Sequence, residues 1–236
     1  MAGAGFIGPV YCDTFIAGTG VPHMWLGLHE PVNTITNAAI LIAAWLAYRH
    51  VKRSGVGFSG GLIVLLVLLV SVGIGSALWH GLRTYWALQL DWIPGVLYLL
   101  ALTVLWIRQL YGWAAGIFGM LAMLALSIAG VAYLGRPLAA ITPNFFALPM
   151  FATVTVTGII MVSGAWRKYG RDTGLLGLAI IAAGLTAAIA RSFDLIVCPV
   201  VPFGTHFLWH IGLSTAACLG VMLIVKMKKG PRAIAA

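Results

Sequence analysis

Charged side chains are scarce in this sequence. Its 236 residues include only 14 Lys or Arg and 5 Asp or Glu, so 8% are charged and 61% are hydrophobic. Soluble domains have roughly 25% charged residues. The chain therefore has too little polar surface for a soluble domain. It also lacks the solvated basic face of a nucleic-acid-binding module, so we expect no nucleic-acid partner despite a formal net charge of +9.

The hydrophobic residues form seven long runs, each close to the roughly 20 residues that a helix needs to cross a bilayer. The runs are 32–48, 60–82, 90–107, 113–134, 145–166, 174–196 and 203–225. They are apolar on every side, unlike the alternating strands of a membrane barrel. The sequence predicts an all-α membrane protein, a single seven-transmembrane helix bundle over residues 1–236, with 1–31 as an N-terminal arm.

The basic residues divide unequally between the two ends of these runs. Lys and Arg are retained on the cytoplasmic side during membrane insertion. One side holds Arg49, Lys52, Arg53, Arg108, Arg167, Lys168, Arg171, Lys226, Lys228, Lys229 and Arg232. The other side holds only Arg83, Arg136 and Arg191. This division predicts that the N-terminus lies outside and the C-terminus in the cytoplasm.

Cysteine is also scarce, with three in the chain. Cys12 lies in the arm and Cys198 follows the sixth run, so both fall on the predicted outer side, where a disulfide persists. Cys218 lies inside the seventh run. A disulfide between Cys12 and Cys198 and two unpaired thiols are both open interpretations.

Five polar residues fall where a membrane span should be apolar, and such residues are costly enough to be functional candidates. Ser76 and His80 are four apart, as are His206 and His210, so each pair lies on one face of its helix. Asp91 lies near the start of the third run. The predicted orientation puts all five in the outer half of the bilayer, at a common depth.

Three histidines with one open position are the ligand set of a catalytic zinc ion. We predict that His80, His206 and His210 hold Zn²⁺, which lowers the pKa of its bound water to about 7 and polarises a carbonyl. Asp91 would orient the water and take its proton, and Ser76 would hydrogen-bond the developing oxyanion. Taken singly, each histidine is more typical of a bundle interior, Ser76 of helix packing, and Asp91 of a helix cap.

Arg191 and Asp194 form a further charged pair at the end of the sixth run. Their i, i+3 spacing brings them together on a helix surface and predicts a structural ion pair. A role near the zinc site is the alternative interpretation.

Four segments together resemble the alkaline ceramidase family, within the superfamily of seven-span hydrolases that includes adiponectin-receptor-like proteins. The segments are residues 30–37 (EPVNTITN), 73–80 (GIGSALWH), Asp91 and 204–210 (GTHFLWH). The resemblance implies Zn²⁺ held by His80, His206 and His210, with Ser76 and Asp91 completing the site. It implies hydrolysis of the amide bond of ceramide to a sphingoid base and a fatty acid.

The resemblance also implies a Ca²⁺ site, as in animal members, formed here by Asp13 and Glu30. Val10 and Phe15 stand where further side-chain ligands are expected. The compact arm and the stretch from Arg191 to Cys198 look more like prokaryotic members. This implies a protein of the plasma (inner) membrane that acts on ceramide or another N-acyl lipid. The predicted orientation puts its site toward the outer leaflet, and no protein partner is implied.

We take a zinc-dependent intramembrane amidase as the leading hypothesis. A lipid-binding receptor or sensor with a structural or weakly catalytic zinc is the alternative, although a structural site closes its fourth position with protein, which leaves Ser76 and Asp91 unexplained. An intramembrane serine protease with Ser76 as nucleophile explains one histidine and leaves two idle. A retinal-binding pump is excluded, because none of the seven runs contains a lysine.

Overall fold

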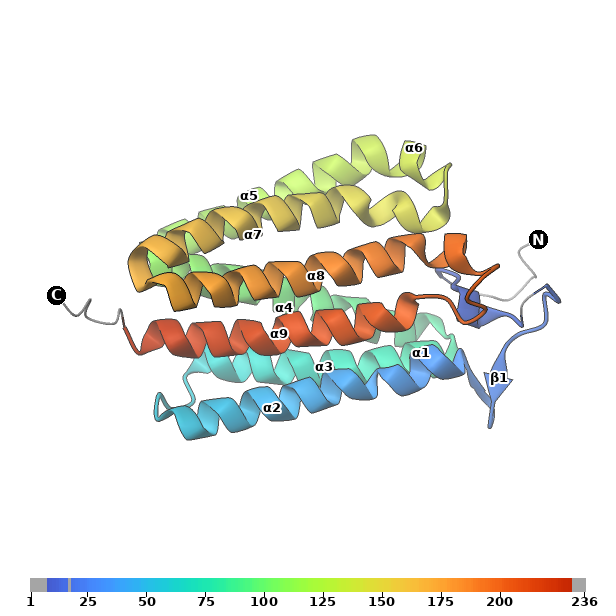
Figure 1. Cartoon of the computed structure of the whole chain (residues 1–236), viewed down its shortest axis with the longest axis horizontal. Coiled ribbons are helices and arrows are strands. Elements are labelled where there is room, and N and C mark those ends of the chain that lie inside the picture. Colours follow the sequence, from blue (N-terminus) through green and yellow to red (C-terminus); the bar gives the residue numbers. More distant parts are fainter. Residues whose placement is uncertain (1–7, 17, 231–236) are drawn as a thin grey trace.

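The computed structural model describes residues 8–16 and 18–230, and they form a bundle of long helices (Figure 1). The helical elements are α1 Pro31–Thr36, α2 Ala38–Ser54, α3 Gly60–Leu82, α4 Tyr85–Tyr111, α5 Trp113–Gly130, η2 Val131–Gly135, α6 Arg136–Ala139, η3 Pro143–Ala147, α7 Leu148–Tyr169, α8 Arg171–Val197 and α9 His206–Lys228. A short 3-10 turn, η1, spans Cys12–Thr14, and the strands β1 Met24–Trp25 and β2 Leu28–His29 pair antiparallel.

Within the described residues, seven helical segments are long and apolar enough to cross a membrane. They are Pro31–Ser54, Gly60–Leu82, Tyr85–Tyr111, Trp113–Ala139, Pro143–Tyr169, Arg171–Val197 and His206–Lys228. The predicted seven-helix membrane bundle is therefore confirmed. Several helices are longer than the hydrophobic runs, because backbone hydrogen bonding continues into the charged turns where hydropathy has already fallen, as at Lys52 and Arg53 of α2.

Two spans contain an irregular turn in their interior. The first span changes from α1 to α2 at Asn37, whose side-chain amide donates to the Asn33 carbonyl at 2.8 Å. The fourth span passes from α5 through the π-helical turn η2 into α6. Such turns inside a helix are commonly found at functional or packing sites.

The N-terminal arm lies across one end of the bundle, which we call the arm end; the C-terminal end of α9 lies at the opposite, tail end (Figure 1). Tyr11 to Thr14 are all buried, although they belong to a loop-rich segment. A disulfide joins Cys12 to Cys198, just beyond the end of α8. The arm is thus a packed part of the fold.

Basic side chains gather at the tail end, in the last turns of α2, α4, α7 and α9. Arg83, between α3 and α4, and Arg191, near the end of α8, lie instead toward the arm end. The unequal division of charge found in the sequence is therefore a division between the two ends of the folded bundle.

Candidate metal centre

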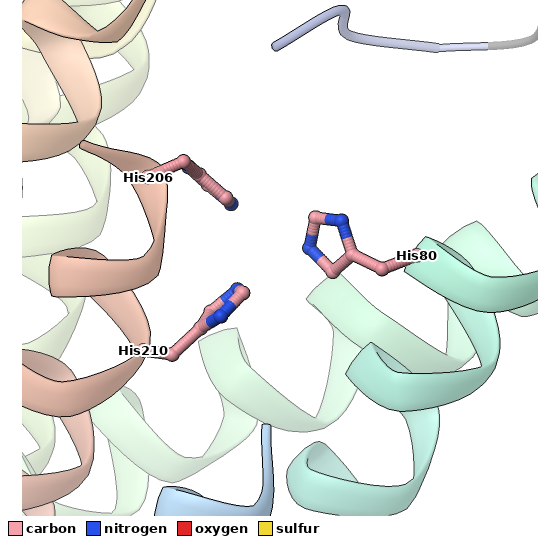
Figure 2. Close-up of side chains that lie close together, drawn as sticks. All are labelled: His80, His206 and His210. Atoms are coloured by element: carbon pink, nitrogen blue, oxygen red, sulfur yellow. The ribbon is translucent and has the colours of Figure 1, made fainter. Parts of the chain in front are cut away.

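Three histidines from two helices meet at the arm end (Figure 2). His80 lies in the last turn of α3, and His206 and His210 lie in the first two turns of α9. One ring nitrogen from each lies within 4.8 Å of the others, and all three side chains are buried. This geometry could hold a metal ion.

The hydrogen bond of His210 fixes which of its nitrogens is free. Thr36 Oγ1 lies 2.8 Å from the Val32 carbonyl, to which it donates, and 2.9 Å from His210 Nδ1. We assign the proton of His210 to Nδ1, which then donates to Thr36, because the Thr36 hydroxyl donates to a backbone carbonyl of its own helix. Nε2 of His210 then has a free lone pair, and it is buried with no hydrogen-bond partner.

His80 is held by a carboxylate. Its Nδ1 lies 2.5 Å from Oε2 of Glu30, the residue before α1. The other carboxylate oxygen of Glu30 accepts a hydrogen bond from Thr14 at 2.5 Å and lies 2.9 Å from Arg83 Nη1. Burial alone would raise the pKa of Glu30, but His80, Arg83 and Thr14 together lower it below its ordinary value. The ionised carboxylate of Glu30 therefore accepts a hydrogen bond from the Nδ1–H of His80, which leaves Nε2 for a ligand.

His206 is positioned by its ring and by its backbone. Tyr11 stacks on the imidazole, with ring centroids 3.7 Å apart. The ring's Nδ1 is buried and has no hydrogen-bond partner. Buried polar atoms left without a partner are destabilising, and a metal ion would satisfy those of both His206 and His210. The donor set therefore fits a metal.

Asp194 fixes the start of α9. Its carboxylate accepts hydrogen bonds from the backbone N–H groups of Cys12 at 2.9 Å, Thr205 at 2.7 Å and His206 at 2.8 Å. A negative charge at a helix N-terminus is also favoured by the helix dipole. The expected ion pair with Arg191 is wrong: among the described residues the ion pairs involve only Asp13, Glu30 and Asp172. Backbone donors from the arm and α9 occupy the carboxylate instead.

The two residues expected to bind Ca²⁺ have other partners. Oδ1 of Asp13 lies 2.9 Å from His23 Nδ1, and Oδ2 accepts from the Asn33 backbone at 2.9 Å. Glu30 is taken by Arg83 and His80. Ca²⁺ requires six to eight oxygen ligands, whereas these carboxylates face nitrogen donors and a guanidinium. The residues present do not fit a calcium ion.

Ser76 and Asp91 are brought together by a glycine. Gly75 of α3 lies directly against the backbone of Leu90 and Asp91, where a Cβ would overlap it. Close helix crossings in membranes rely on such small residues. The Ser76 side chain consequently forms a hydrogen bond with the Asp91 carboxylate, one turn of α3 before His80.

A cavity of about 410 Å³ extends from these residues into the bundle. Ser76, Asp91 and the three histidines line one part of it, and the rest is mostly apolar, including Leu102, Trp106, Met123, Met161 and Ile180. Along α4 the lining runs from Asp91 to Trp106, roughly 22 Å at 1.5 Å per residue. One leaflet's hydrocarbon layer is about 15 Å deep, so the cavity is long enough for a lipid chain.

The structure brings His80, His206, His210, Ser76 and Asp91 to one cavity. Sequence reasoning missed three supporting residues. Thr36 and Arg83 offered weak signals: Thr36 belongs to the segment 30–37, and Arg83 is one of few basic residues on its side. Tyr11 offered none, because nothing local relates it to α9.

A family model described as Ceramidase matches residues 28–230. The match runs from just before Glu30 to the end of α9 and includes all five residues of the cavity site, while Cys12 and Asp13 lie outside it. A search of curated proteins found no match to the chain.

Proposed function

Because the chain belongs to the Ceramidase family, we propose that it is a zinc-dependent intramembrane hydrolase that cleaves the amide bond of ceramide or another N-acyl lipid. The products are a sphingoid base, or another amine, and a fatty acid. One observation carries the proposal: three buried histidines, two of them with unpartnered ring nitrogens, converge beside an apolar cavity.

Zinc is the metal that the donor set favours. Three imidazoles with an open fourth position are typical of catalytic zinc, and no thiolate competes, since Cys12 and Cys198 are bridged. His80, His206 and His210 would hold the ion. When bound, it polarises the substrate carbonyl and lowers the pKa of a water molecule.

Glu30 and Thr36 prepare two of these ligands. Each accepts the Nδ1–H of a histidine, which fixes the tautomer and the ring orientation. Both acceptors belong to the segment around α1, on a different helix from the ligands. The first span therefore contributes to the site although none of its residues would bind the metal.

Asp91 and Ser76 would carry the proton transfers. Asp91 takes a proton from the attacking water as the oxygen bonds to the amide carbon, then gives it to the nitrogen as the C–N bond breaks. Before the reaction, the single hydroxyl hydrogen of Ser76 is donated to the Asp91 carboxylate. Once Asp91 holds the water proton, the Ser76 hydroxyl would donate instead to the carbonyl oxygen as that oxygen gains negative charge. The contact between Asp91 and Ser76 across the α3–α4 crossing supports these two roles, because both side chains line the cavity.

We place the site toward the outer leaflet, as in a prokaryotic plasma membrane. The basic residues at the tail end favour a cytoplasmic location for that end. The disulfide at the arm end is of a kind that persists outside the reducing cytosol. A lipid substrate would enter sideways, with its acyl chain in the apolar part of the cavity and its amide beside the histidines.

The test measures zinc content and fatty-acid release by the full chain purified in detergent, using ceramides and other N-acyl lipids. His206→Ala should lose both zinc and release. His50→Ala, a control near the tail end of α2, should keep both. A wild-type protein free of zinc, or equal release by His206→Ala, would overturn the zinc assignment. Zinc bound without turnover of any N-acyl lipid would favour the receptor alternative.

A further inference from the structure

One guanidinium at the arm end is not accounted for by the metal centre. Arg191 lies in the last two turns of α8 and lines the cavity together with Ser76, Asp91 and the histidines. Its Nη1 is buried and has no hydrogen-bond partner. None of the ion pairs among the described residues involves it, although all five acidic residues of the chain are described.

Neighbouring groups hold Arg191 in place. Asn144 donates to its backbone carbonyl at 3.3 Å, and Thr205 donates to the preceding carbonyl at 2.7 Å. The guanidinium carbon lies 5.8 Å from the Phe151 ring and 5.6 Å from the Trp209 ring. Aromatic rings within about 6 Å attract a guanidinium. The side chain is thus positioned between α7 and α9 beside the cavity.

A long basic side chain near a helix end usually extends to water at the bilayer surface. Arg191 does not do so fully, because Nη1 is shielded from solvent. The side chain as a whole is half-buried, but a shielded guanidinium N–H without an acceptor is destabilising. The helix spacing offers Asp194, but its carboxylate is taken by three backbone N–H groups. Asp91 is close enough to interact electrostatically with Arg191 but forms no ion pair with it. An anion entering the cavity would supply the acceptor that Nη1 lacks.

We propose that Arg191 binds an anionic group of the substrate, a carboxylate or a phosphate, next to the scissile amide. Its planar fork of donors matches both groups. The proposal rests on the proposed function and narrows it: among N-acyl lipids, this site prefers those with an anionic head group over neutral ones.

The first test compares kcat/KM for three substrates with the same hexadecanoyl chain: N-acylglycine, N-acylethanolamine phosphate and neutral N-acylethanolamine. Wild-type protein should prefer an anionic substrate over the neutral one, and the preference should fall by about 10- to 100-fold in Arg191→Gln, as expected for lost charge-assisted hydrogen bonds. The two anionic arms distinguish carboxylate from phosphate. Arg191→Lys should retain part of the preference. Arg136→Gln, which removes an exposed guanidinium of α6, should retain all of it.

The second test does not depend on turnover. Hexadecyl phosphate and hexadecanoate should raise the apparent Tm of the zinc-loaded wild-type protein more than hexadecanol does, and Arg191→Gln should lose that difference. If no N-acyl lipid is hydrolysed but the difference appears, the proposed function fails and the anion site stands. Hydrolysis with the same substrate preference in wild type and Arg191→Gln would overturn the anion site alone. If Arg191→Gln does not fold, the same comparison is made with Arg191→Lys. A substrate preference in Arg191→Lys equal to that of the wild type would overturn the role of the planar guanidinium in binding the anion.

Discussion

Nη1 of Arg83 lies 2.9 Å from Oε1 of Glu30 in a buried ion pair. Arg83 also donates to the Pro9 carbonyl at 2.8 Å, and its guanidinium lies 4.1 Å from the Trp79 ring. Both members of the pair have left-handed backbone angles, with φ of 52° for Arg83 and 44° for Glu30. Such angles cost about 1–3 kcal/mol each and persist where the surroundings impose them. The positive charge beside Glu30 is therefore part of the fold.

Activity should not require calcium. The resemblance to animal ceramidases implies a calcium ion at Glu30, but here a guanidinium supplies the positive charge and His80 takes the other oxygen. Fatty-acid release should be the same with added Ca²⁺ and with a calcium-selective chelator. Stimulation by Ca²⁺ in the micromolar range would contradict this.

Arg83→Met should weaken zinc binding. Without the guanidinium, Glu30 loses its buried counter-charge and holds His80 less firmly, and loss of such outer partners typically costs about 10- to 100-fold in metal affinity. Competition with a chromophoric chelator measures the affinity. Arg136→Met is the matched control, because Arg136 is exposed. Equal affinity in both variants would remove Arg83 from the support of the site.

Thr36→Val should have a similar effect through a different ligand. The substitution keeps the shape but leaves the Nδ1–H of His210 buried with no acceptor. We expect zinc affinity to fall by about 10- to 100-fold. Thr215→Val on α9 serves as control, since the Thr215 hydroxyl is exposed and bonds only to its own helix, at the Ile211 carbonyl. If the two variants bind zinc alike, His210 does not depend on this hydrogen bond.

Much of the architecture follows from local sequence signals. Seven apolar runs predict seven spans, because each run must satisfy its backbone hydrogen bonds as a helix. The i, i+4 spacings place Ser76 with His80, and His206 with His210, on single helix faces. The positive-inside rule orients the spans, and this orientation predicts that the two faces lie at the same depth in the bilayer. These signals need only the periodicity of a helix and the thickness of a bilayer.

Partners that are distant in sequence could not be found in this way. Helix spacing pairs Asp194 with Arg191, but the Asp194 carboxylate accepts from a backbone N–H 182 positions away, at Cys12. The carboxylate of Glu30 likewise meets His80, 50 positions away. Helix periodicity says nothing about which loop covers the end of the bundle, and this loop determines both contacts.

Asp91→Asn and Ser76→Ala should separate turnover from metal binding. Neither side chain is a proposed ligand, so zinc content should remain at the wild-type level. Loss of a general base typically costs about 10²–10⁴-fold in rate, and loss of one oxyanion donor about 10²–10³-fold. Elemental analysis and kcat on one N-acyl lipid measure the two properties. Zinc-free Ser76→Ala protein would show that Ser76 supports the ligands instead.

Reduction of the Cys12–Cys198 disulfide should loosen the arm end. The bond closes a separation of 186 residues, and disulfides of long loops typically stabilise by about 2–4 kcal/mol. It also holds the segment from which Tyr11 stacks on His206. A reductant should therefore lower the apparent Tm and the zinc affinity of wild-type protein in detergent. The paired variant Cys12→Ser/Cys198→Ser should start at those lower values and not respond to the reductant, because Cys218 is the only remaining thiol and forms no disulfide. An unchanged Tm in reduced wild-type protein would show that packing of the arm, and not the covalent link, keeps Tyr11 over the histidines.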